Sequence, residues 1–149
     1  MNLVARPRSL FTFEFDVFDE SETVVASFRH RAFRSVGSVS VDGTEYEVSR
    51  AGTGLGVEAD GHRPVSVDSA GGGQMQVRWK GGSLRLARAG IGFRLHVIAD
   101  GAVIGTLGLR DLFGRTMVFD TEREVPPLVA AALFYLAVAR RRQLLMVGT

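Results

Sequence analysis

Residues 126–142 read PPLVAAALFYLAVARRR, and this stretch decides the fold of the chain. Two prolines suit the first turn of an α-helix, and the Ala- and Leu-rich run after them contains neither Gly nor Pro. Because Leu128–Ala139 is apolar around its whole circumference, it has to be surrounded by protein or by lipid. A bilayer requires about 20 apolar residues, and this run has 12. The stretch therefore predicts a buried helix at about 126–142, with Arg140–Arg142 near its C-terminus, where positive charge is favoured.

The chain before this helix consists of short segments in which apolar and polar residues alternate. Along Phe11–Phe18, apolar side chains recur at every second position, which is typical of a strand with one buried face. The same pattern continues in ten further segments: Glu22–His30, Arg34–Val41, Thr44–Arg50, Gly54–Ala59, Arg63–Asp68, Gln74–Trp79, Ser83–Arg88, Phe93–Ala99, Ala102–Leu109 and Thr116–Asp120. We therefore expect about eleven strands between residues 10 and 120.

Glycine-containing pairs separate these segments. Asp-Gly stands at 42–43, 60–61 and 100–101, and Gly-Gly stands at 81–82. Such dipeptides tolerate a positive φ and favour the two-residue turns that match the twist of a β-hairpin. The composition agrees, because 18 Gly residues supply turns while only 4 Pro residues are present to interrupt strands. Successive strands are therefore expected to be antiparallel neighbours.

These elements fit one architecture. The 149 residues suit one domain of ordinary size. A wholly buried helix has to be wrapped, and eleven or twelve antiparallel strands are about enough to close a barrel around it. The sequence thus predicts a mainly β protein, with residues 1–149 as a single domain. In it, a closed antiparallel barrel of about twelve strands at about 10–120 surrounds a buried hydrophobic C-terminal helix at about 126–142.

The order of these elements resembles the tubby C-terminal-like superfamily, which includes plant LURP-one-related proteins, phospholipid scramblases and many small bacterial proteins. The resemblance rests on the hairpin series, the strand pair Phe93–Ala99 and Ala102–Leu109, and the run from Asp120 through Pro126-Pro127 into the helix. It implies about twelve strands closed around that helix. It carries over no site residue: Lys80 is the only lysine, and the segment at Asp111 lacks the carboxylates of the scramblase calcium segment.

The charge pattern argues against nucleic acid as a partner. The formal net charge is +2, and residues 1–125 carry 15 basic and 16 acidic side chains. The other basic residues are Arg140–Arg142. Binding to nucleic acid requires a basic stripe that neutralises several phosphates, and a balanced body with one basic triplet does not offer such a stripe.

No catalytic or metal-binding motif stands in the sequence. Cysteine is absent, which excludes disulfides, thiolate nucleophiles and Cys-ligated metals. His30, His62 and His96 lack the spacing that would place two ring nitrogens on one metal, and no Ser lies in a G-x-S-x-G elbow. The glycine-rich stretch at 52–56 precedes a strand-like segment rather than the helix of a dinucleotide-binding fingerprint. We therefore expect no enzymatic activity, no metal and no cofactor.

Two clusters of basic residues are candidate sites for an anion or a lipid headgroup. The clusters are Arg29, Arg31 and Arg34, and Arg78 with Lys80 beside Trp79. Guanidinium groups that project from one face of a strand bind such anions through bidentate hydrogen bonds. The tryptophan between the second pair suits either a membrane interface or the core.

These features predict a non-enzymatic binding or scaffold domain that recognises membrane lipid headgroups or a protein partner at the barrel surface. The alternative is a membrane-associated protein that uses residues 128–147 as a C-terminal anchor. Met1–Arg8 lack an apolar run of signal-peptide length, so a cytoplasmic location is expected. A helix that spans the membrane is not expected, because the apolar run is too short.

Overall fold

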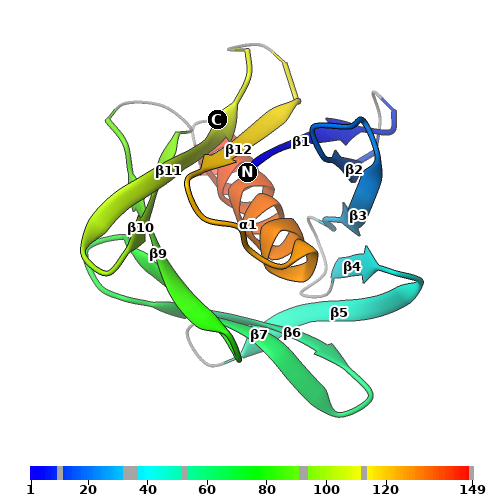
Figure 1. The fold of residues 1–149 in the computed structure, drawn as a ribbon, viewed down its shortest axis with the longest axis horizontal. Helices are drawn as coiled ribbons and strands as arrows, with labels where there is room; N and C mark the ends of the chain where they lie inside the picture. The colour runs from blue at the N-terminus through cyan, green and yellow to red at the C-terminus, as the bar shows by residue number, and fades with distance from the viewer. Residues whose placement is uncertain (10–11, 32–36, 52–53, 91–93, 112–113, 148–149) are drawn as a thin grey trace.

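The computed structural model describes residues 1–9, 12–31, 37–51, 54–90, 94–111 and 114–147 (Figure 1). In these residues it contains twelve β-strands followed by one α-helix, α1 (Pro127–Val147). The strands are β1 (Asn2–Pro7), β2 (Glu14–Phe18), β3 (Val24–Arg29), β4 (Gly37–Val41), β5 (Thr44–Ala51), β6 (Gly54–Ala59), β7 (His62–Ser69), β8 (Met75–Trp79), β9 (Gly82–Arg88), β10 (Leu95–Ala99), β11 (Ala102–Leu109) and β12 (Met117–Thr121).

The twelve strands form one closed antiparallel barrel in which each strand pairs with its neighbours in the sequence. The seam joins the first strand to the last: β1 pairs with β12, with Asn2 opposite Asp120 and Ala5 opposite Met117. The helix α1 follows β12 and runs through the interior of the barrel (Figure 1). The predicted fold class, a barrel of about twelve strands around a C-terminal helix, is confirmed.

The barrel begins earlier in the chain than the sequence pattern predicts. The strand β1 is absent from the prediction because only Leu3 and Ala5 are buried within it, and two positions are too few to make an alternation stand out. Pro7 ends the strand, since proline lacks the N–H group that a ladder requires. The strands therefore extend from Asn2, not from about residue 10, to Thr121.

Tight turns connect several of the hairpins. In each of the three Asp-Gly pairs both residues have a positive φ, 50–52° for the aspartates and 76–78° for the glycines. This backbone matches the type I′ turn that joins two strands with the natural twist, so the prediction at these pairs is confirmed. The fourth turn lies one residue earlier than expected. Trp79 pairs with Gly82, so Lys80 and Gly81 form the loop.

The helix fills the barrel. All ten residues of Val129–Val138 are buried, and inward-facing side chains from the strands pack around them. Phe28 of β3 stacks on Phe15 of β2, with ring centroids 4.9 Å apart, and its ring lies 6.5 Å from that of Phe134 on α1. Full burial of one such side chain stabilises the fold by about 1.5–3 kcal/mol. The helix continues to Val147, five residues beyond its expected end, because the residues there are good helix formers.

Candidate functional site

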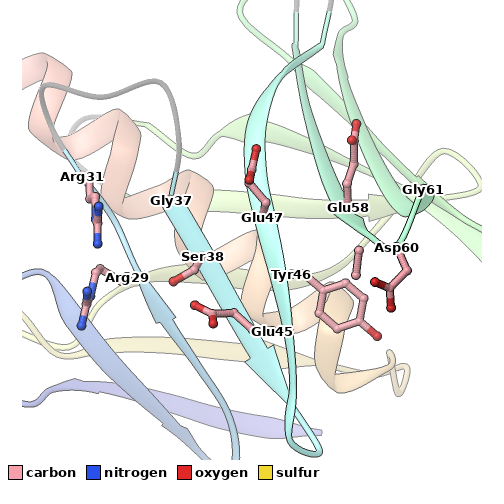
Figure 2. Close-up of a pocket in the computed structure, with 11 residues that line it drawn as sticks. Arg29, Arg31, Gly37, Ser38, Glu45, Tyr46, Glu47, Glu58, Asp60 and Gly61 are labelled. Carbon is pink, nitrogen blue, oxygen red and sulfur yellow. The ribbon is translucent and has the colours of Figure 1, made fainter.

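Arg29 and Arg31, two of the predicted anion-binding residues, lie beside a hollow on the outer face of the barrel (Figure 2). Arg29 is the last residue of β3, and its Nη2 lies 2.5 Å from Oε1 of Glu14 on β2. Arg31 follows two residues later and is exposed. Arg34, the third residue of this cluster, lies outside the described residues. Arg29 is therefore already paired with a carboxylate of the protein.

Carboxylates outnumber arginines around this hollow. Four of them line it: Glu45, Glu47, Glu58 and Asp60. The strand register explains the arrangement, because Ser38 of β4 stands opposite Glu47 of β5, which stands opposite Glu58 of β6. Two carboxylates in directly opposed positions repel each other. Although Glu58 also pairs with Arg63, the surplus of negative charge disfavours an anion inside this hollow.

The second predicted cluster lies on another wall of the barrel. Arg78 projects outward from β8 and is exposed, with its Nη1 3.7 Å from a carboxylate oxygen of Asp68. Lys80 is exposed in the turn after β8. Trp79, between them, points to the opposite face and packs against the core, which is one of the two positions that the sequence suggested for it. The structure therefore does not bring Arg78 and Lys80 together with Arg29 and Arg31.

A barrel built of sequential hairpins sends alternate loops to opposite ends. We call the end at which α1 begins the acidic end. Its loops carry eight carboxylates and two basic residues: Asp19, Glu20, Glu22, Asp42, Asp60, Asp100, Glu122 and Glu124, with Lys80 and Arg123. Two of these carboxylates are paired, Glu22 with Arg6 on β1 and Asp100 with Arg123, at 2.6 and 2.8 Å. The loops of this end thus hold a clear excess of negative charge.

We call the opposite end, toward which α1 runs, the basic end. In the described residues, its loops and the second half of α1 carry eight arginines and one carboxylate: Arg8, Arg31, Arg94, Arg110, Arg115, Arg140, Arg141 and Arg142, with Asp111. Arg31 and Arg94 are exposed and form no ion pair with any described carboxylate. Arg110 is also exposed, but it lies close enough to Glu22 for its charge to help lower the pKa of that carboxylate. Sequence reasoning missed this surface because its members are scattered from residue 8 to residue 142.

Arg142 fixes the helix to the barrel wall at the basic end. Its guanidinium carbon lies 3.6 Å from the centroid of the Phe13 ring, and its Nη1 lies 2.9 Å from Nδ1 of His30. Burial, assisted by the charge of Arg142, lowers the pKa of His30 to about 4. The imidazole is therefore neutral at neutral pH, and its Nδ1 accepts the hydrogen bond from the guanidinium.

Arg115 and Arg141 complete the centre of the basic end. Arg115 donates hydrogen bonds to the carbonyl oxygens of Ser9, at 2.8 Å, and Thr12, and Arg141 donates to the carbonyl oxygen of Gly114 at 3.1 Å. Burial lowers the pKa of each guanidinium, and the charge of Arg141 lowers the pKa of Arg115 further. Three arginines of one sign thus gather at the mouth of the barrel, which strengthens its positive potential.

Three further findings bear on function. Within the described ranges, no three His, Asp or Glu side chains come together so that they could hold a metal ion. No helix formed by the described residues is both long enough and apolar enough to cross a membrane. Comparisons with protein-family models, curated proteins and solved structures found no match. The geometry and charge of this chain are therefore the features that point to a function.

Proposed function

We propose that this protein is a non-enzymatic binding domain that recognises anionic membrane lipid headgroups with the basic end of its barrel. The separation of charge between the two ends of the barrel carries the proposal. Each arginine near an anionic bilayer contributes about 1 kcal/mol of attraction, and a guanidinium binds a phosphate oxygen pair bidentately. Several exposed arginines at one end therefore supply affinity for a headgroup layer without a deep pocket.

The proposed surface overlaps the expected sites only in part. Arg31 belongs to the basic end, whereas Arg29 is engaged by Glu14 on the outer wall. Lys80 lies at the acidic end, with Arg78 close to it in the chain. Membrane binding through the first cluster alone would place the carboxylates of the outer hollow against anionic lipid, which like-charge repulsion opposes.

The alternative, a C-terminal membrane anchor at residues 128–147, is less well supported. Val129–Val138 form the centre of the core, where every side chain is buried. Withdrawal of this segment into a bilayer would expose the inward faces of the strands to water, at a cost of about 25 cal/mol for each Å² of apolar surface. We therefore favour a domain that keeps its helix inside the barrel while its outer surface binds.

We further propose that the chain is a relative of the tubby C-terminal-like superfamily. The support is architectural: twelve antiparallel strands around a hydrophobic C-terminal helix is the arrangement that the resemblance implies. Family membership alone would not define a ligand, because unrelated functions share one fold. A protein partner and a cytoplasmic location stay predictions from the sequence.

Co-sedimentation with vesicles tests the lipid proposal. Vesicles of phosphatidylcholine with phosphatidylserine should bind the protein, vesicles of phosphatidylcholine alone should not, and binding should weaken as salt is raised. The double variant Arg31→Glu/Arg94→Glu should bind at least about tenfold more weakly, because it removes two attractive charges and adds two repulsive ones. Both residues are exposed and form no ion pair with a described carboxylate, so the variant should fold normally.

The matched control is Lys80→Glu/Arg123→Glu, which makes the same change in net charge at the acidic end. It should bind vesicles nearly as well as the unmodified protein does. Equal losses in the two variants would show that net charge alone, not the basic end, drives binding. Failure of the unmodified protein to bind phosphatidylserine vesicles at low salt would overturn the proposal.

A further inference from the structure

Building on the proposed function, we infer that the barrel docks end-on onto an anionic bilayer. In this geometry the basic end meets the headgroups, the barrel axis lies close to the membrane normal, and the acidic end faces away from the lipid. The proposed function requires that residues of the basic end bind anionic lipid, whereas this inference fixes the orientation of the barrel on the bilayer and which residues lie far from the lipid.

The first observation that favours end-on docking is that arginines lie on opposite walls of the basic end. Arg31 lies two residues after the end of β3 and Arg94 directly precedes β10, and these strands lie on nearly opposite sides of the twelve-stranded barrel (Figure 1). Arg140 belongs to α1, which runs between the two walls. A flat anionic surface can contact both walls at once only when its plane is roughly perpendicular to the barrel axis. Side-on docking would engage one wall alone.

The second observation that favours end-on docking is the negative charge of the acidic end. Asp42 and Glu124 are exposed there and form no ion pair with a described basic residue. Asp60 is exposed at this end too, although it also lines the outer hollow beside which Arg31 lies. Opposite charges at the two ends give the molecule an electrostatic dipole along the barrel axis. Near a negatively charged surface, the basic end is attracted and the acidic end is repelled, so both forces turn the barrel in the same direction.

The sequences of the connecting segments favour a bilayer over a soluble polyanion. In the sequence, the connection from β1 to β2 reads RSLFTF and the connection from β11 to β12 reads RDLFGRT. Of their apolar residues the structure describes Phe13, which lies beneath the guanidinium of Arg142 at the basic end. At the acidic end, the segments DESET, DG, DG, KG, DG and EREVP contain no aromatic residue. Surfaces that bind the membrane interface combine basic with apolar residues, whereas binding to a nucleic-acid backbone depends on charge.

Trp79 provides an internal reporter for the far end. It is the only tryptophan in the chain, and it ends β8 beside the turn at the acidic end. Its side chain is half-buried against the core and packs close to the hairpin, since a Cβ atom at Gly82 would lie 3.3 Å from its ring. End-on docking through the basic end should therefore leave the fluorescence of Trp79 unchanged.

The test moves the reporter from one end to the other. Thr12 is exposed in the loop between β1 and β2, so the variant Trp79→Phe/Thr12→Trp carries a single tryptophan at the basic end. On phosphatidylserine vesicles, its emission should shift to shorter wavelength and should be quenched by brominated lipid. The unmodified protein, bound to the same vesicles, should show neither change. Asp111→Trp in the Trp79→Phe background reports from the β11–β12 loop if the Thr12 variant loses its native circular dichroism spectrum.

The outcomes separate the two proposals. Vesicle binding with quenching of Trp79, or with no change at either position at the basic end, would overturn end-on docking while the lipid-binding function stands. Absence of vesicle binding by the unmodified protein would overturn both, and binding to duplex DNA in place of vesicles would do the same. Vesicle binding with quenching at Thr12→Trp and none at Trp79 is the expected result.

Discussion

Gly37 of β4 lies so close to Tyr135 of α1 that a Cβ atom at residue 37 would stand 2.3 Å from the tyrosine hydroxyl oxygen. The same atom would lie 2.7 Å from the carbonyl oxygen of Arg29. A side chain at residue 37 would therefore displace the helix or the neighbouring strand. Glycine at this position lets α1 pack closely against β3 and β4, the two strands that it contacts most extensively.

Gly37→Ala should lower the free energy of unfolding by about 1–3 kcal/mol, because the added methyl group overpacks the contact with the helix. Urea unfolding followed by circular dichroism measures the change. Ser38→Ala, at the adjacent outward-facing position, should change stability by less than about 0.5 kcal/mol. The double variant Gly37→Ala/Tyr135→Leu should recover part of the loss, and a Gly37→Ala protein of unchanged stability would contradict the close packing.

Leu133→Asp should leave the protein unfolded at room temperature. Leu133 is fully buried in the helix, and an unpaired carboxylate in such a place costs several kcal/mol of a total stability of only about 5–15 kcal/mol. The conservative variant Leu133→Met should stay folded, with a loss below about 1.5 kcal/mol. Thermal melting compares the two. A sharp native-like transition in Leu133→Asp would mean that the helix is not enclosed by the barrel.

The fold should lose stability as the pH falls from about 6.5 toward 4, in part through His30. Burial and the charge of Arg142 lower the pKa of this residue from 6.5 to about 4, so between these values the unfolded chain binds the proton and the folded chain does not. The contribution of the neutral ring is therefore complete above pH 6.5 and declines through this window. Urea unfolding at pH 7 and pH 4.5 measures the effect.

His30→Gln is the matched control for this pH dependence, because the glutamine amide can accept a hydrogen bond but does not titrate. Carboxylates elsewhere in the protein also titrate in acid, so the informative quantity is the difference between the two proteins. The variant should show a smaller loss of stability between pH 7 and pH 4.5. Identical losses would show that His30 is solvated and titrates as it does in the unfolded chain.

The fold was largely predictable because each of its signals is local. Alternation over five to eight residues marks the strands, the Asp-Gly pairs supply turns with positive φ, and the apolar run after Pro127 can only be enclosed. β1 escaped prediction because its burial rests on Leu3 and Ala5 alone and becomes complete only when β12 pairs with it. The stability of that strand is a property of the closed barrel, not of the segment.

The candidate site was much less predictable, because residues that are close in the sequence do not show which other side chains the fold places beside them. Arg29 and Arg31 share a segment, but the strand register brings Glu47 and Glu58 toward the same hollow, and no pattern within one segment shows this. The basic end depends on topology: Arg31 and Arg94 are far apart in sequence and meet one surface because alternate hairpin loops share an end. The available signal was that several loops at one end are basic while most loops at the other end are acidic.

The seam between β1 and β12 has a consequence for how the chain assembles. Asn2 meets Asp120 only after nearly the whole protein has left the ribosome, whereas each hairpin can form as soon as its two strands emerge. Until then β1 presents an unpaired edge, and the strands await a helix that is synthesised last. A pairing between segments this far apart in the sequence is slow to form, and it prolongs the exposure of aggregation-prone edges. Closure of the barrel and packing of the helix inside it therefore occur at nearly the same time. A chain truncated before Pro127 would have to close the barrel without the helix that fills its interior.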